Sequence, residues 1–383
     1  MAGTFNEHSH GQAPIQTRSE RLKSANPQDF PAVSRLDEQW RYLDAERLGG
    51  LTGDDLAEFS GDIELQGPSE IAASWVDSSD TSFGATGLPE DRIAAAAWSS
   101  AKQAYKIVVP DSFESEEPIR LLLTGHDLEA SALHLILAAG KFSRFTLSIE
   151  HTGSAQLAEN VELLIGDEAA VKVVSVQNWS KDSVHVSSQR ANIGRNAALE
   201  HVVVTLGGKT VRITPTVDYK APGGSVNLLG AYFATSGQYL EHRPFIDHSQ
   251  PQCKSNVTYK GALQGEKAHT VWVGDVLIRK AAEGTDTYEL NRNLILTDGA
   301  RADSVPNLEI ETGEIEGAGH ASASGRFDDE HLFYLQARGI TELEAKRLVV
   351  KGFLNEVIQQ IEIADLENEL NELIEAELAR SIG

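Results

Sequence analysis

The sequence is poor in thiols, because its 383 residues include one cysteine, Cys253. A single cysteine excludes an intramolecular disulfide framework. It also excludes a zinc or iron–sulfur site built from four thiolates of this chain alone. Basic residues are scarce as well, with 33 Lys and Arg against 57 Asp and Glu, so the formal net charge is −24. Nucleic-acid binding is therefore disfavoured as the main function, since phosphate contacts need a basic face.

Long apolar runs and enzyme motifs are also missing. No stretch of eighteen apolar residues occurs, so no segment is expected to span a bilayer. The polar N-terminus has no apolar signal-peptide core, which predicts a cytoplasmic protein. The phosphate loop of ATPases, the Gly-x-Ser-x-Gly nucleophile elbow and the His-Glu-x-x-His zinc helix are absent from the sequence. We therefore predict a chain that is not an enzyme and does not hydrolyse ATP itself.

Four regions follow one another along the chain. Residues 1–25 are polar and are predicted to form a disordered tail, and residues 26–105 are predicted to be helical or irregular. In residues 106–325 apolar residues alternate with period two in short runs, and no helical segment intervenes, which predicts an all-β region. Residues 326–383 return to helical spacing and predict a C-terminal helical region.

Short repeated units occur within the β region. A glycine, a small residue three positions later and a strand recur at Gly166/Ala169, Gly194/Ala197, Gly265/Ala268 and Gly299/Ala302. Such units are typical of a β-solenoid, in which every coil needs tight corners and small inward residues. A β-sandwich would have similar strands, so periodicity alone leaves both folds open.

Helical spacing appears at both ends of the chain. Leu36, Trp40 and Leu43 predict one face of an N-terminal helix. Near the C-terminus, the capping box Thr341–Glu344 opens a helix, and a second helix follows it. The apolar positions of the two helices are Leu343, Val350, Leu354, Val357, Ile358, Ile361, Leu366, Leu370, Leu373 and Ile374. These helices are predicted to cap the end of the β region, to form an arm that docks a partner, or to do both.

Two residues are candidates for chemistry. His320 lies among glycine, alanine and serine, which leave its imidazole accessible as a metal ligand or as a hydrogen-bonding group at an interface. Cys253 is the only thiol, and it is either a ligand or a small buried core residue. Neighbouring Lys254 would lower the pKa of the thiol only if both side chains faced the same side, which adjacent strand residues do not.

Several ordered motifs carry a resemblance to a known family. The chain resembles the SufB/SufD family of iron–sulfur cluster assembly scaffolds, and among them the D-type subunits. The matching motifs are Glu38–Tyr42, Val176–Ser180, His248-x-x-Pro251-x-x-x-Ser255-x-x-x-x-Lys260-Gly261, Ser304–Ile310, Gly319–Ala321 and Asp328–Ile340.

The resemblance implies a fold and partners. The fold would be a right-handed parallel β-helix flanked by N-terminal and C-terminal α-helical regions. The partners would be a SufB-like scaffold subunit and two copies of a SufC-like ATPase, so that ATP acts only through the partner ATPase. The resemblance also implies that the C-terminal region docks the ATPase. The implied interface residues are Asp328, Asp329, Leu332, Phe333, Tyr334, Arg338, Leu343, Val350 and Leu354.

The resemblance further implies a site of cluster assembly. His320 falls where D-type subunits place a histidine across the interface from a cysteine of the B-type subunit. A neutral imidazole can ligate iron, so His320 would bind a transient iron–sulfur cluster shared with the SufB-like partner. Some D-type subunits carry a cysteine two residues earlier, where this chain has Ala318. Cys253 remains a second candidate for cluster binding.

Two alternatives belong to other functional classes. One is a β-helix enzyme acting on acidic polysaccharide, although the acidity of this chain would repel a polyanion. The other is a homo-oligomeric structural β-helix, in which the chain would form a homodimer on its own. Such a homodimer would not exchange with a SufB-like partner.

Overall fold

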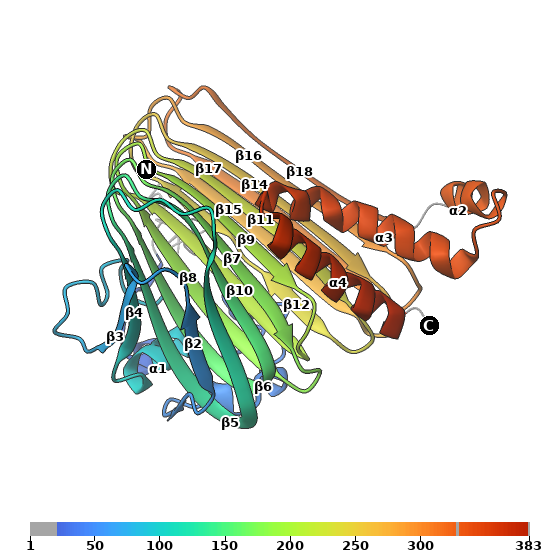
Figure 1. Cartoon of the computed structure of the whole chain (residues 1–383), viewed down its shortest axis with the longest axis horizontal. Helices are drawn as coiled ribbons and strands as arrows, with labels where there is room; N and C mark the ends of the chain where they lie inside the picture. The colour runs from blue at the N-terminus through green and yellow to red at the C-terminus, as the bar shows by residue number, and fades with distance from the viewer. Residues whose placement is uncertain (1–20, 327–328, 382–383) are drawn as a thin grey trace, which may run out of the picture.

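The chain forms a flattened β-solenoid in a computed structural model that describes residues 21–326 and 329–381 (Figure 1). Most of the predicted N-terminal tail and the implied interface residue Asp328 lie outside the described residues. Within the tail, residues 21–25 are described, and Arg21 forms an ion pair of 2.8 Å with Glu90. No helix in the described ranges combines the length and apolarity needed to cross a membrane.

The strands stack in parallel from coil to coil. Arg144 aligns with Ala170, 26 residues further along the chain (170 − 144), and Lys254 aligns with Asp286, 32 residues further (286 − 254). Each coil contributes one strand to each of two sheets, and about eight coils are present. The structure therefore confirms the parallel β-helix and rules out the sandwich that periodicity had left open.

The two sheets face each other across the core. The first sheet contains β5 (Ile119–Ala139), β6 (Arg144–Ile165), β7 (Ala170–Trp179), β9 (Ala198–Thr205), β11 (Ser225–Ala234), β14 (Lys254–Leu263), β16 (Asp286–Ile295) and β18 (Gly317–Arg326). The second sheet contains the later halves of β5 and β6, with β4 (Ala104–Val109), β8 (Val184–Ile193), β10 (Thr210–Tyr219), β12 (Tyr239–His242), β13 (Phe245–His248), β15 (His269–Ile278) and β17 (Arg301–Ile310).

Alternate residues of every strand point into the space between the sheets. Leu147 in β6 aligns with Ile119 in β5 and with Val173 in β7, and all three are buried. Like residues thus stack along the solenoid axis in columns. Burying each such side chain contributes roughly 1.5–3 kcal/mol, which makes these columns the main source of stability.

Glycine and alanine form the corners between coils, as the repeated units predict. A Cβ on Gly166 would lie 2.8 Å from the carbonyl oxygen of Ala139, and one on Gly194 would lie 2.8 Å from the amide nitrogen of Asp167. Coils only about 4.8 Å apart leave no room for a larger residue at these corners. Gly265 has a φ of +86°, a left-handed conformation that glycine adopts without steric cost.

Replacing Gly261 by alanine is expected to destabilise the fold by about 1–3 kcal/mol, because overpacking forces neighbours out of place. Gly261 lies in β14, and a Cβ there would overlap the ring of fully buried Tyr232. That ring cannot move freely, since its hydroxyl donates a 2.8 Å hydrogen bond to Asn293. Chemical denaturation measures the change in the free energy of unfolding. Gly313→Ala is the control, because no atom lies within 4 Å of the added Cβ. Equal stability of the two variants would contradict this account.

The N-terminal region covers the outer face of the second sheet with its turns and its helix, whereas its short strands pair with β4 and β5. It contains the 3₁₀ turns η2 (Pro27–Asp29), η3 (Glu38–Trp40) and η4 (Ala45–Thr52), the helix α1 (Arg92–Ser100), and the short strands β1 (Ala57–Glu58), β2 (Asp62–Gln66) and β3 (Ala72–Val76). Trp40 and Leu43 are buried, as expected, but Leu36 is 97% exposed. The predicted helical face was wrong at Leu36 because the chain forms separate 3₁₀ turns, which do not keep the 3.6-residue period.

The second and third of the C-terminal helices cover the outer face of the first sheet, whereas the first lies off the sheet (Figure 1). The helical elements are α2 (Asp329–Gln336), α3 (Glu342–Ile358), η5 (Gln359–Ile361) and α4 (Ala364–Ser381). The Thr341 hydroxyl accepts a hydrogen bond from the Glu344 amide, which confirms the predicted N-cap of α3. Val202 and Phe233 of the sheet belong to one buried cluster with Val350 and Leu370 of the helices. The helices therefore cover a face of the solenoid and not its end, which corrects the first of the two predicted roles.

Candidate functional site

The C-terminal end of the solenoid presents two edge strands. In the described part of the chain, β17 pairs only with β15, and β18 pairs only with β16. Both strands are markedly less buried than the strands behind them. Within the described residues, no other strand pairs with the outer sides of β17 and β18. Edges of this kind are the ones that β-strand addition uses.

His320 lies on the edge strand β18, where its side chain is exposed. It aligns with Glu289 of β16, and that residue aligns with Val257 of β14, a member of the interior core. His320 therefore belongs to the column of side chains that faces the interior, at the open rim of the last coil. Ala318 and Ser322 share its face and are small, so they leave the imidazole accessible.

The rim offers a single imidazole from this position. Within the described residues, His320 is not part of a group of three or more metal-ligating side chains. A metal bound there would need its other ligands from a second molecule. The neighbouring Ser322 hydroxyl lies 2.8 Å from that of Ser304, which ties β18 to β17 and holds the rim together.

Cys253 lies elsewhere, at the corner before β14. It is fully buried in the interior core, and its Sγ lies 3.5 Å from the carbonyl oxygen of Pro251. Burial raises the pKa of the thiol, which keeps it protonated and makes it a poor ligand. Lys254 points away and contacts Glu316 at 3.5 Å. The structure does not bring Cys253 and His320 together, because β16 lies between the strands that carry them.

The residues implied at the ATPase interface fall into two groups. Phe333 and Tyr334 of α2 are 73% and 54% exposed, and the Arg338 guanidinium lies 4.5 Å above the Tyr334 ring. Val350 and Leu354 are instead fully buried against the first sheet of this chain. Their assignment to a partner interface was wrong, because the same apolar spacing serves the chain's own core.

Four other residues of that set need separate mention. Leu343, at the start of α3, is 39% exposed and remains available for a contact. Asp328 lies outside the described residues, as do the side chains of Asp329 and Leu332.

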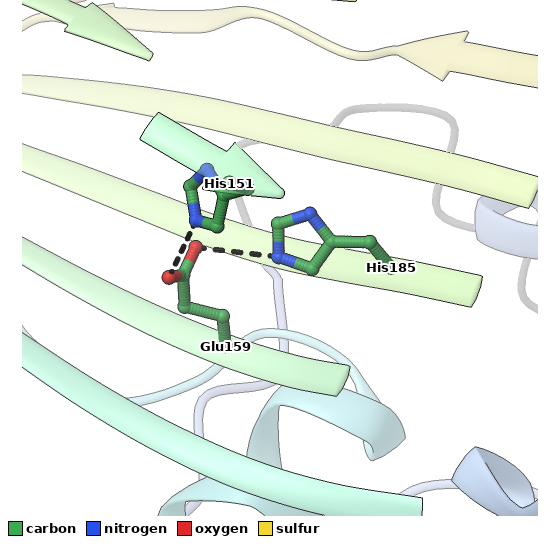
Figure 2. A group of neighbouring side chains, drawn as sticks. All are labelled: His151, Glu159 and His185. Carbon is green, nitrogen blue, oxygen red and sulfur yellow. Dashed lines mark hydrogen bonds and ion pairs between the residues drawn. The ribbon is translucent and has the colours of Figure 1, made fainter. Parts of the chain in front are cut away.

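A second polar site lies inside the solenoid. His151 and Glu159 come from β6 and His185 from β8, and all three side chains are buried. Figure 2 shows both imidazoles turned toward the Glu159 carboxylate. His151 Nε2 lies 3.1 Å from Oε1, and His185 Nε2 lies 3.4 Å from Oε2. Among the described residues, these side chains form the one group of three with metal-ligand chemistry and spacing.

The surroundings of this cluster are polar. The Ser187 hydroxyl donates a 2.7 Å hydrogen bond to Glu159 Oε2, and His151 Nδ1 lies 3.1 Å from the Val176 carbonyl oxygen. Although burial favours the protonated acid, the two imidazoles hold the pKa of Glu159 well below its usual range. Burial lowers the pKa of His185, against the attraction of Glu159.

Sequence reasoning missed this cluster. The three residues match no local motif, because the stacking of coils brings them together and they are not neighbours along the chain. One signal was present in β6. Phe145, Leu147 and Ile149 are alternate residues that point inward, and His151 occupies the next such position, where another apolar residue is expected. A polar residue at an inward position calls for buried partners.

The described residues form a parallel β-solenoid whose last coil has two edge strands and one exposed imidazole, that of His320. Comparisons with known proteins show the family of this solenoid. Residues 121–353 match the family model described as "SUF system FeS cluster assembly, SufBD core domain". That range covers more than half of the chain, so the chain belongs to the SufBD family of iron–sulfur cluster assembly proteins.

Named relatives agree with this membership. The chain is 48% identical over 357 residues to an iron–sulfur cluster assembly SufBD family protein of Mycobacterium leprae, covering 91% of each chain. It is 47% identical over 369 residues to one of Mycobacterium bovis, covering 94% of this chain and 93% of the relative. A more distant SufBD family protein of Synechocystis is 26% identical over 213 residues, covering 56% of this chain and 47% of the relative.

Proposed function

We propose that this chain is a non-catalytic scaffold subunit of a cytoplasmic iron–sulfur cluster assembly complex. It pairs through its open end with a SufB-like subunit and docks a SufC-like ATPase on its C-terminal helices. The observation that carries this proposal is the exposed His320 on an open strand edge, in a chain that belongs to the SufBD family. The homo-oligomeric alternative predicts that the same edge pairs with a second copy.

Pairing at the open end follows from the state of the edge strands. Ile310, the last residue of β17, is 46% exposed, so an apolar side chain lies beside unpaired backbone groups. Natural proteins usually protect a long edge strand by covering or charging it. A partner strand would satisfy the backbone groups and bury Ile310 at the same time.

Shared cluster binding follows from the number of ligands. A cluster needs several ligands, and His320 is one imidazole at a rim where the small side chains of Ala318 and Ser322 leave space. Cys253 is buried away from the rim, so it is excluded from the proposed ligand set. The thiolates that iron prefers would then come from the SufB-like partner, and the cluster would form only in the complex.

ATPase docking is assigned to the exposed part of the C-terminal region. Phe333 and Tyr334 are large and exposed, and aromatic side chains of this kind dominate binding energy at interfaces. Leu343 extends the apolar surface onto α3. ATP hydrolysis by the docked partner would supply the motion that this chain cannot generate.

Ile310→Lys tests the proposed pairing surface. The change places a charge at the open edge and removes an apolar group worth roughly 1.5–3 kcal/mol on burial. We expect the dissociation constant for the SufB-like subunit to rise at least about tenfold, measured by calorimetry with purified chains. Leu128→Lys is the matched control, because Leu128 is 44% exposed and lies in β5 at the opposite end. Unchanged affinity of Ile310→Lys would refute pairing through β17. Dissociation of a homodimer, with no SufB-like binding by wild type, would favour the homo-oligomeric alternative.

A further inference from the structure

The buried cluster of His151, Glu159 and His185 has no part in the proposed scaffold function. It lies inside the solenoid, and its side chains are drawn from both sheets. His151 aligns with Gln177 in the first sheet, whereas Glu159 aligns with Ser187 in the second. The three ligand atoms lie within 4.8 Å of one another.

Hydrogen bonds at the far side of each ring define where the ring protons lie. His151 Nδ1 lies 3.1 Å from the Val176 carbonyl oxygen, which can only accept, so this nitrogen carries a proton. His185 Nδ1 lies 2.8 Å from Gln177 Oε1 and 3.1 Å from Trp179 Nε1. The indole N–H can only donate, so Nδ1 accepts from Trp179, and a neutral, metal-free His185 ring carries its proton on Nε2, toward Glu159.

This arrangement turns the Nε2 lone pair of neutral His151 toward the Glu159 carboxylate. A lone pair facing a carboxylate repels it unless a proton or another positive species lies between them. A proton there would pair His151 with Glu159, whereas a metal ion could be held by both imidazoles and the carboxylate at once. Histidines that bind a metal through Nε2 usually donate their Nδ1–H to a carbonyl oxygen or a carboxylate, as His151 does here.

We propose that His151, Glu159 and His185 bind one divalent cation of the zinc type as a structural site that links the two sheets. Two imidazoles and one carboxylate suit Zn²⁺, and they leave one position of a tetrahedral shell for a further ligand such as water.

The distances fit such a site with a small contraction. Bonds of about 2.0–2.1 Å place tetrahedral ligand atoms roughly 3.3–3.4 Å apart. The contact of His151 with Glu159 Oε1, at 3.1 Å, and that of His185 with the other oxygen, Oε2, at 3.4 Å, are each close to that spacing. The widest separation, within 4.8 Å, closes by side-chain rotation when the ion binds. Because the site is fully buried, the ion enters as the chain folds and exchanges slowly afterwards.

Refolding the full-length chain tests this assignment. The chain is unfolded in denaturant with a chelator and refolded with or without Zn²⁺, and unbound metal is removed by dialysis. We expect elemental mass spectrometry to detect about one zinc ion per chain. The zinc-loaded form should melt at a higher temperature than the metal-free form, because binding to the native state stabilises it. A wild-type chain that refolds in excess Zn²⁺ and retains none would overturn the proposal.

Matched variants locate the ion. Glu159→Gln keeps the side-chain volume and should weaken zinc retention by at least about 10–100-fold. His201→Gln is the control, since His201 is equally buried in β9 and is not part of the cluster. His320→Ala should also retain zinc, so this result is independent of the proposed cluster role of His320.

A spectroscopic readout covers the case in which Glu159→Gln fails to fold. Wild-type chain refolded with Co²⁺ should show the visible d–d absorption of a four-coordinate site with nitrogen and oxygen ligands. Natively folded chain without that absorption, or Glu159→Gln that folds and keeps its zinc, would contradict the assignment.

Discussion

Complexes assembled with His320→Ala are expected to hold about one tenth or less of the iron and sulfide of the wild-type complex, since ligand loss weakens metal binding strongly. The chain, its SufB-like partner and the ATPase would be co-purified without oxygen, and iron, sulfide and visible absorbance measured. Assembly itself should not change. His320 is exposed, and surface substitutions usually alter stability by less than about 0.5 kcal/mol.

His126→Ala is the matched control for this experiment. His126 is an exposed histidine in β5, where it contacts Asp62 at 2.8 Å, at the end of the solenoid away from the open rim. Its loss should leave iron and sulfide unchanged. A wild-type cluster content in His320→Ala would remove this histidine from the cluster site and leave the chain a mechanical support. A matching fall in melting temperature and cluster content would instead indicate a structural role.

The second large effect concerns ATPase capture. Phe333→Ser and Tyr334→Ser should each weaken binding of the SufC-like ATPase by roughly 30-fold or more, since buried aromatic anchors contribute about 2 kcal/mol or more at interfaces. The double variant should lose the ATPase in a pull-down at micromolar concentration. Pairing with the SufB-like subunit should persist, because the altered side chains lie on α2 and not on β17 or β18.

Phe142→Ser is the control, because it also removes an exposed aromatic side chain. Phe142 is 55% exposed at the corner between β5 and β6, at the other end of the solenoid. Full ATPase capture by the double variant would show that the ATPase does not bind through Phe333 and Tyr334 of α2. Point variants are preferable to deletion of residues 328–383, because deletion would also uncover the apolar face formed by Val202, Phe233 and their neighbours.

Family membership narrows the functional classes that the sequence left open. An enzyme acting on polysaccharide gains no support from a SufBD core match over residues 121–353. The homo-oligomeric alternative concerns the same open edge as the proposed pairing. It is therefore decided by the binding measurements on Ile310→Lys.

Local features were predictable because they depend on neighbours in the chain. The corner residues Gly166 and Ala169 need only the tight turn between two strands, and the Thr341 cap needs only the first turn of α3. His320 was predictable as accessible, since its flanking residues are small. The prediction for Leu36 was wrong because helical spacing does not reveal whether a short segment forms an α-helix or separate 3₁₀ turns.

Other features depended on how the coils stack. Alternating strands, small corners and amphipathic C-terminal helices follow from the sequence alone, because each depends on residues close together in the chain. The burial of Cys253, and of Val350 and Leu354 against the chain's own sheet, follows instead from how distant segments pack. Only stacking brings His151 to His185, since contacts between coils are set by coil length and register, which no single segment encodes.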